Sequence, residues 1–225
     1  MKLTEKQVKT KINKFIKGIK VDKRDASYDF CYLYFQENKR NLVGSNMENS
    51  CMHLWSFLAS WGMLRGSSPL FKCSPFVLKD LIVYFDTIQD RNIWNADVNT
   101  YNEDGTEIIE VYNEISKILE KNIGAKPTIT LVTKIMLGVF GCVPAVDQYF
   151  YDTFHLLYGG FRTIEMKELN SIFDFYKAHQ SLIDGVHVEV FDFEDSHTEY
   201  VYKKAKLIDM FGFVFGFDHK NTISK

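Results

Sequence analysis

The feature that most constrains this chain is a strongly apolar segment, residues 131–143, which a proline and then an aspartate follow. Such a segment is typical of a helix buried on most of its surface, so the rest of the chain must supply a core around it. Proline favours the first helical position because its φ is fixed and it lacks an N–H group, so Pro144 predicts the start of the next helix. Asp147 would then lie in the first turn, where unpaired N–H groups and the helix dipole favour an ionised carboxylate.

A carboxylate at that position has two interpretations. An ionised Asp147, which follows the buried helix in the sequence, can stabilise a developing cation. It is our candidate catalytic residue. Acidic residues are also common in first turns simply as caps, and the pattern alone leaves that structural role open. We take the candidate catalytic segment to be a central helix–turn–helix over about residues 106–158.

Length and composition indicate one globular domain over residues 1–225, with apolar residues for a large core, since 46% of the residues are hydrophobic. Cys31, Cys51, Cys73 and Cys142 show no CxxC spacing. Neither they nor the six histidines form a zinc or iron–sulfur ligand set, so we expect free thiols, no metal and no cofactor. The chain shows no signal-peptide pattern and no apolar run of about eighteen residues, so we expect a cytoplasmic protein without a membrane partner. We take it to be a monomer.

The N-terminal segment is strongly basic, although the net charge of the chain is only −2. Residues 1–24 hold eight lysines and one arginine against two acidic residues. Apolar side chains recur there at helical spacing, namely Val8, Ile12, Phe15, Ile16 and Ile19. This pattern predicts a basic amphipathic helix over about residues 3–20. Its lysines can bind phosphates, lie on a membrane surface, or merely balance the acidic segments 86–120 and 189–199.

The remaining periodicity predicts an all-α fold. The other expected helices cover about residues 26–37, 48–63, 106–122, 130–140, 144–158, 163–179 and 198–211. A further helix is expected to begin at Pro75, with Ser74 as its cap. Residues 187–193 alternate like a strand, but a lone strand has no partner in a helical chain, so we interpret them as an extended linker. The apolar residues 212–217 are expected to pack against the core.

A second candidate site is the turn at residues 61–69, which ends an apolar helix. Ser67 and Ser68 offer hydrogen-bond donors there. Arg65 adds a planar fork of donors, and Trp61 offers a stacking face. Such a turn can bind a phosphate or the edge of a base. An ordinary helix end, with the arginine at the C-terminal dipole, fits the same residues.

With its preceding apolar helix, the stretch Gly141–Asp147 resembles the segment of the helix-hairpin-helix DNA glycosylase superfamily in which a small or apolar loop and a proline lead to the catalytic aspartate. The resemblance covers residues 131–150. That family usually carries a Gly-x-Gly turn whose backbone N–H groups bind a DNA phosphate, and residues 122–130 keep only Gly124 of it. The chain is therefore similar to a divergent member of the superfamily.

The resemblance implies a two-lobed helical domain that binds DNA, extrudes a base and breaks its N-glycosidic bond. Asp147 would stabilise the oxocarbenium-like sugar and orient or deprotonate the attacking water. The phosphate contacts of the hairpin would pass to nearby residues, namely Lys126, Thr128, Thr130, Thr133 and Lys134. Further candidates are Arg65, Ser67 and Ser68 as DNA contacts, and Trp61, Tyr149, Trp55 and Tyr32 as walls of the base pocket.

Members of the superfamily that also cleave the DNA strand carry a lysine nucleophile in the hairpin. By spacing from Asp147 the corresponding positions are Thr128 and Ile129, neither of which is a lysine, so we expect a monofunctional enzyme. Lys126 and Lys134 lie close enough in sequence to leave a lyase step open. We expect Lys134 to face phosphate or solvent from its helix. Some small bacterial members remove bulky modified bases, such as glucosylated hydroxymethylcytosine, from viral DNA in anti-phage defence, and the degenerate hairpin favours that group.

Two other classes of function remain open on the sequence. In the first, the chain is a non-catalytic, all-helical nucleic-acid- or protein-binding module, and Asp147 is only a helix cap. In the second, it is an unrelated enzyme that acts on a small ligand.

Overall fold

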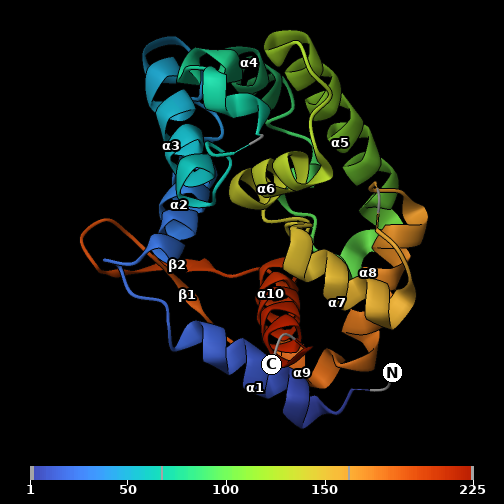
Figure 1. Ribbon diagram of the computed structural model, residues 1–225. Coiled ribbons are helices and arrows are strands. Elements are labelled where there is room, and N and C mark those ends of the chain that lie inside the picture. Colours follow the sequence, from blue (N-terminus) through green and yellow to red (C-terminus); the bar gives the residue numbers. More distant parts are fainter. Residues whose placement is uncertain (1–2, 67, 162, 224–225) are drawn as a thin grey trace.

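The structure, a computed structural model, describes residues 3–66, 68–161 and 163–223, with side chains described through residue 220 (Figure 1). Within it 69% of the residues are helical and 4% lie in strands, so the predicted all-α class is confirmed as a predominantly helical fold. The helices are α1 (Glu5–Ile16), α2 (Ser27–Asn38), α3 (Met47–Ser60), α4 (Lys79–Thr87), α5 (Tyr101–Ile123), α6 (Ile129–Phe140), α7 (Gln148–Tyr158), α8 (Met166–Ala178), α9 (Gln180–Asp184) and α10 (Lys204–Ile223). The strands are β1 (Glu189–Phe191) and β2 (His197–Val201).

Helix α6 lies in the middle of the fold, and residues 131–140 are all buried (Figure 1). It packs against α2, α3 and α5. The approach to α3 is so close that a Cβ atom on Gly138 would lie 2.6 Å from the Phe57 ring. At the C-terminal end of α6, the Phe140 ring centroid lies 5.3 Å from that of Phe85 and 4.8 Å from that of Trp94. The apolar segment is therefore the central helix of the core, as its sequence predicts.

Helix α10 packs closely along α7. A Cβ atom on Gly212 would lie 2.4 Å from the Phe150 ring, and one on Gly216 would lie 2.2 Å from the carbonyl oxygen of Tyr149. These glycines let the two helix backbones approach one another. The predicted helix end near residue 211 is therefore wrong, because the glycines at 212 and 216 serve packing inside one long helix. None of the described helices is both long and apolar enough to cross a membrane.

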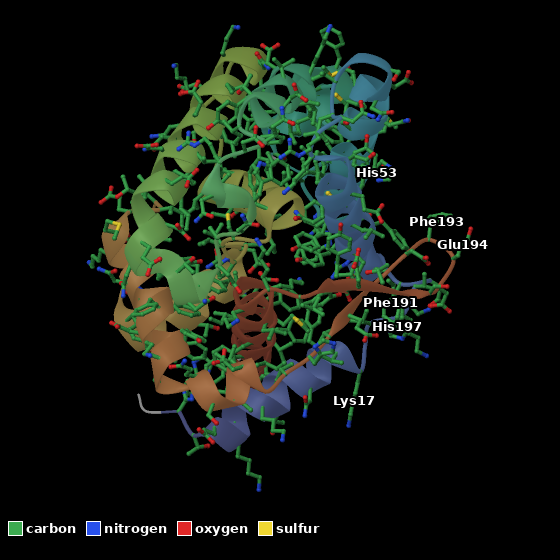
Figure 2. The ribbon with its side chains drawn as sticks, turned by 180° about the vertical axis from the view of Figure 1, so that it is seen from behind. Lys17, His53, Phe191, Phe193, Glu194 and His197 are labelled. Atoms are coloured by element: carbon green, nitrogen blue, oxygen red, sulfur yellow. The ribbon has the colours of Figure 1, made fainter. Side chains whose placement is uncertain are left out.

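Residues 189–201 form a β-hairpin, so the predicted linker at 187–193 and the predicted helix start at Thr198 are wrong. Strand β1 pairs antiparallel with β2, which directly follows the turn. The Asp192 carboxylate closes that turn by accepting backbone N–H groups of Glu194 (2.9 Å) and Ser196 (2.8 Å). The hairpin projects from the body of the molecule, and its tip residue Phe193 is 85% exposed (Figure 2).

Several helix boundaries follow capping groups rather than the residues expected from the sequence. Helix α5 begins at Tyr101 instead of Thr106, because a 3-10 turn capped by Asp97 leads into it. The same carboxylate accepts the backbone N–H groups of Lys204 (2.8 Å) and Ala205 (2.9 Å) at the start of α10. The end of α5 is as predicted, with Gly124 in the left-handed conformation that glycine allows.

Two further predicted starts are displaced. Helix α8 begins at Met166, three residues after Thr163. Behind Ser74, residues Pro75–Leu78 form a 3-10 turn before α4, and Ser74 makes no side-chain capping hydrogen bond.

Asp29 is a fully buried carboxylic acid on α2. Neither of its oxygens has a well-formed hydrogen bond among the described residues. Burial raises the pKa of Asp29 to about 7 from an ordinary value of 3.8, although the Tyr202 hydroxyl and the Lys206 ammonium oppose the rise. Folding therefore favours the protonated form of this carboxyl between these two pH values.

We expect the wild type to lose stability relative to Asp29→Asn as the pH rises from about 5 to about 8. The folded pKa of Asp29 lies above its unfolded value, so its favourable contribution is present at low pH and is lost as pH rises through the folded pKa. The loss should amount to about 1–3 kcal/mol in the free energy of unfolding, measured by urea titration. Asp174→Asn, at an exposed site on α8, is the control. A difference between wild type and Asp29→Asn that does not change with pH would contradict the prediction.

Candidate functional site

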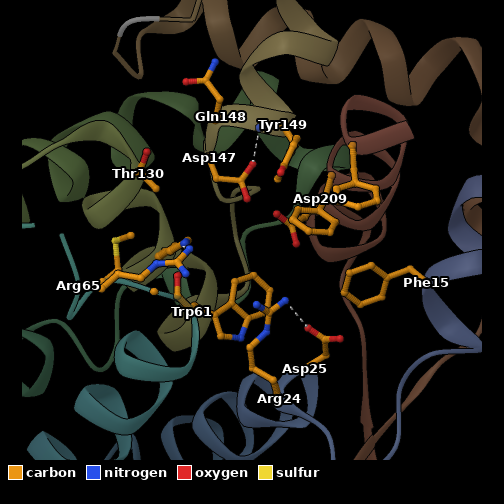
Figure 3. A pocket seen from close by; sticks show the side chains of 15 residues that line it. Phe15, Arg24, Asp25, Trp61, Arg65, Thr130, Asp147, Gln148, Tyr149 and Asp209 are labelled. Carbon is orange, nitrogen blue, oxygen red and sulfur yellow. Dashed lines mark hydrogen bonds and ion pairs between the residues drawn. The ribbon is translucent and has the colours of Figure 1, made fainter. Parts of the chain in front are cut away.

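A pocket of about 460 Å³ opens where six segments of the chain meet (Figure 3). These are the end of α1, the 3-10 turn at Arg24–Ala26, the turn after α3, the first half of α6, the start of α7 and the middle of α10. Six of the candidate residues line it, although they are far apart in sequence: Trp61, Arg65, Thr130, Lys134, Asp147 and Tyr149. The structure thus brings the two candidate segments, 61–69 and 131–150, to one cavity.

Asp147 is the N-cap of α7, not a residue of its first turn. Its Oδ1 accepts the backbone N–H groups of Tyr149 and Phe150, each at 3.0 Å. The prediction that Pro144 starts this helix is wrong, since α7 begins at Gln148 and the proline lies in the turn before it. The second oxygen, Oδ2, takes no part in these capping bonds, and Figure 3 shows the carboxylate facing the cavity.

Side chains from two helices hold the turn that precedes Asp147. The Thr133 hydroxyl accepts the backbone N–H of Val146 at 2.9 Å and donates to the carbonyl of Ile129 at 2.8 Å. The Thr130 hydroxyl donates to the carbonyl of Val146 at 2.7 Å. On the other side, Asp209 of α10 accepts the backbone N–H of Ala145 at 3.1 Å. Thr133 is itself fully buried, so its role is to support the turn rather than to contact a phosphate.

Burial is the largest influence on the ionisation of Asp147, and it raises the pKa of this carboxyl. The negative charge of Asp209 acts in the same direction, whereas the two capping N–H groups and Lys134 lower the pKa. The net direction is upward. The N–H groups favour the ionised form, as the sequence predicts for a helix start, but desolvation outweighs them.

Lys134 does not face solvent, contrary to expectation. It is 5% exposed, and its Nζ donates to the carbonyl oxygen of Trp61 at 2.6 Å while lying 5.8 Å from the centre of the Trp61 ring. Burial lowers the pKa of Lys134, and the negative charges of Asp147 and Asp209 oppose that shift. The ammonium therefore ties α6 to the turn after α3, inside the pocket wall.

The other described candidates lie outside the pocket lining. Thr128 caps α6 by accepting the N–H of Leu131 at 3.2 Å, and Lys126 is exposed in the linker before it. The Ser68 hydroxyl donates to the carbonyl of Met63. Ser67 lies outside the described residues.

Two of the proposed pocket walls belong to the core instead. Tyr32 is 3% exposed and its ring stacks on that of Tyr28 at 5.5 Å. Trp55 is partly buried against the core cluster. Neither is among the residues that line the pocket.

Several lining residues were not identified from the sequence. Arg24 and Asp25, from a 3-10 turn at Arg24–Ala26, form a 3.4 Å ion pair at the pocket, and their side chains are 61% and 30% exposed. Asp209 and Phe213 come from α10. A usable signal was present for Asp209, since it is a single carboxylate within the apolar run from residue 207 to 217.

Helix α1 forms one wall of the pocket rather than a free basic arm. Val8 and Ile12 are buried, α1 packs on α10, and Phe15 lines the pocket. Lys11 and Lys14 both form ion pairs with Asp218 of α10, at 2.8 Å and 2.7 Å. Part of the basic face is thus used to hold α1 in place.

No group of three or more histidine, cysteine, aspartate or glutamate side chains within residues 3–66, 68–161 and 163–220 could hold a metal ion. All four cysteines are free thiols. Comparisons of the chain with protein-family models, with curated proteins and with solved structures gave no match.

We expect Thr133→Val to lower the free energy of unfolding by about 1–3 kcal/mol, because the buried N–H of Val146 loses its acceptor. Urea unfolding measures this. The matched control is Thr10→Val on α1, where an exposed hydroxyl makes the same bond to the carbonyl four residues earlier, at 2.7 Å. Equal effects of the two substitutions would show that the Thr133 hydroxyl does not support the turn.

Proposed function

We propose that the protein is a DNA glycosylase that hydrolyses the N-glycosidic bond of an extruded, modified or damaged base, with Asp147 as the catalytic carboxylate. The observation that carries this proposal is the distribution of charge in the pocket. Its rim holds the exposed Arg65 and the ion pair of Arg24 with Asp25, a net positive charge, whereas the carboxylates of Asp147 and Asp209 lie deeper. A cationic rim suits DNA phosphates, and an anionic interior suits a sugar that becomes positively charged.

The reaction follows from the position of Asp147. As the C1′–N bond breaks, its electron pair leaves with the base and positive charge develops on the sugar. A water oxygen then bonds to C1′, and the water proton passes to the Asp147 carboxylate, which afterwards releases it through solvent to the base anion. The raised pKa of this carboxyl makes it a better proton acceptor while it is ionised. The products are the free base and an abasic site.

Aromatic side chains provide the surface for the extruded base. Trp61 and Tyr149 both line the pocket, and both are partly buried. Base–aromatic stacking contributes about 1–3 kcal/mol per base and tolerates different bases. The Tyr149 ring is held by edge contacts with Phe213 at 5.2 Å and Phe217 at 5.5 Å between ring centroids.

The state of Lys134 favours hydrolysis by water over a lyase step. An amine nucleophile needs a free lone pair near C1′. The Nζ of Lys134 instead donates to the carbonyl oxygen of Trp61 at 2.6 Å. We therefore propose a monofunctional enzyme, which leaves the DNA strand intact.

The substrate class that we favour is a bulky modified base, such as glucosylated hydroxymethylcytosine in phage DNA. The volume of about 460 Å³ lies within the range of about 300–1,000 Å³ that small-molecule pockets occupy. Asp25, Gln148 and Arg24 supply polar groups around it that can bind hydroxyl substituents. The likeness to anti-phage members of the helix-hairpin-helix superfamily, with their two-lobed fold, supports the same choice.

The second candidate is a non-catalytic nucleic-acid- or protein-binding module. It is favoured by the complete capping geometry of Asp147, whose Oδ1 already accepts two backbone N–H groups. In that case the carboxylate would serve the start of α7 alone.

Asp147→Asn separates the two candidates. Asparagine is as good an N-cap as aspartate, so the melting temperature should stay within about 2 °C of the wild type. Abasic-site formation, revealed by alkali on DNA that the wild type acts on, should fall by at least about 100-fold, because the carboxylate charge and the proton acceptor are lost. Affinity for that DNA should be equal or higher, since a negative charge is removed. Activity retained in Asp147→Asn would reject Asp147 as the catalytic residue.

The two rim arginines should contribute to DNA affinity through phosphate contacts. For a duplex that carries a stable abasic-site analogue, Arg24→Gln and Arg65→Gln should each reduce the slope of log K against log salt by about 1. Titrations from low to moderate salt, followed by fluorescence anisotropy, give this slope. Lys117→Gln on α5, which does not line the pocket, is the control. Unchanged slopes in both arginine variants would place the DNA elsewhere on the surface.

A further inference from the structure

Asp209 is a buried carboxylate that lies beside Asp147 in the pocket wall. It is 4% exposed, and in Figure 3 its carboxylate and that of Asp147 face the same space. Its Oδ1 accepts the backbone N–H of Ala145 at 3.1 Å, and its Oδ2 accepts from Lys206 Nζ at 2.8 Å. Asp209 thus bonds to the turn that carries Asp147, although it comes from a helix more than 60 residues later in the chain.

Lys206 is one of the most deeply buried charges among the described residues, with its side chain 1% exposed. Its Nζ lies 4.3 Å from the Trp61 ring centre, 4.6 Å from that of Tyr28 and 5.1 Å from that of Phe15. A buried ion pair of this kind is often no more stable than apolar side chains of the same volume. Stability therefore does not explain why the chain places the pair directly behind the pocket.

We propose that Asp209 is a positioning residue for Asp147, which fixes the turn through the Ala145 N–H and supplies a negative charge beside the catalytic carboxylate. This inference rests on the proposed function. Lys206 completes the arrangement by holding the Asp209 carboxylate in one orientation, since it bonds to the oxygen that the turn does not use.

The charge of Asp209 has a direct effect on the chemistry. The charged and titratable groups that line the pocket with Asp147 are Lys134 from α6, Arg65 from the turn after α3, Arg24 and Asp25 from their 3-10 turn, Tyr149 from α7 and Asp209 from α10. Of these, Asp209 raises the pKa of Asp147 and Lys134 lowers it. A more basic carboxylate accepts the water proton more readily, and a second anion stabilises the cationic sugar.

Two variants separate the hydrogen bond from the charge. In Asp209→Asn a single oxygen must serve both the Ala145 N–H and Lys206, so the turn loses its fixed acceptor. In Asp209→Asn with Lys206→Met the competing donor is gone, the amide oxygen is free for Ala145, and methionine fills the space among the three rings. Asp174→Asn on α8 is the control, because it removes an equal charge from an exposed site that does not line the pocket.

The measurement is the single-turnover rate of abasic-site formation as a function of pH, with the melting temperature of each variant. Asp209→Asn should be slower by about 10-fold or more, because small misplacements of a reacting group are costly. The double variant should return to within about 3-fold of the wild-type rate. Its rate should fall off at a lower pH than in the wild type, since Asp147 loses a neighbouring negative charge. Asp174→Asn should keep the wild-type rate and pH dependence.

The role of Asp209 would be rejected, and the proposed function left intact, by one combination of results. In it, Asp209→Asn keeps the wild-type rate and loses activity at the same acidic pH as the wild type, whereas Asp147→Asn is inactive. If Asp209→Asn fails to fold, the double variant tests the role of Asp209 instead. The role is rejected if the rate of the double variant falls off at the same acidic pH as that of the wild type. A wild type that forms no abasic sites would reject the proposed function and this inference together.

Discussion

The structure depends on how the buried turn between α6 and α7 is satisfied. Residues 141–146 are buried without belonging to a helix or strand, so their backbone polar groups need partners from elsewhere in the chain. Side chains supply them: Tyr101 bonds to the carbonyl of Cys142, Asp209 to the N–H of Ala145, Thr133 to the N–H of Val146 and Thr130 to its carbonyl. These bonds connect α5, α6 and α10 to a single short segment. The same segment ends at Asp147, so the packing of the fold determines where this carboxylate lies.

The rim and the interior of the pocket have different origins. Packed helices build the interior, since α6 is buried on all sides and Gly212 and Gly216 let α10 lie close to α7. The rim comes from two irregular segments, which carry Arg24 and Arg65. Lys134 joins the two parts through its hydrogen bond to the carbonyl of Trp61. A change in the turn after α3 would therefore alter the position of Lys134 in the pocket wall.

The sequence pattern predicted those features of the structure that depend on residues adjacent in the chain. The apolar run identified α6 as the core helix, and the position of Asp147 at a helix start followed from the residues beside it. Pro144 was misleading because tertiary hydrogen bonds to the turn, rather than the proline, set where α7 begins. The hairpin partner of β1 was missed because the Asp192 turn makes the next few residues the second strand. Asp209 reaches the pocket only through packing, so no local pattern could assign its contact with Ala145.

The proposed glycosylase removes a base from DNA by hydrolysis, which mass spectrometry can detect. It would identify the small molecules released when the wild type is incubated with DNAs of several modification states, including glucosylated phage DNA. We expect at least one DNA to release an intact free base while its strands stay unbroken until alkali is added. Release of no free base from any of these DNAs, at enzyme concentrations equal to the DNA, would contradict this proposal.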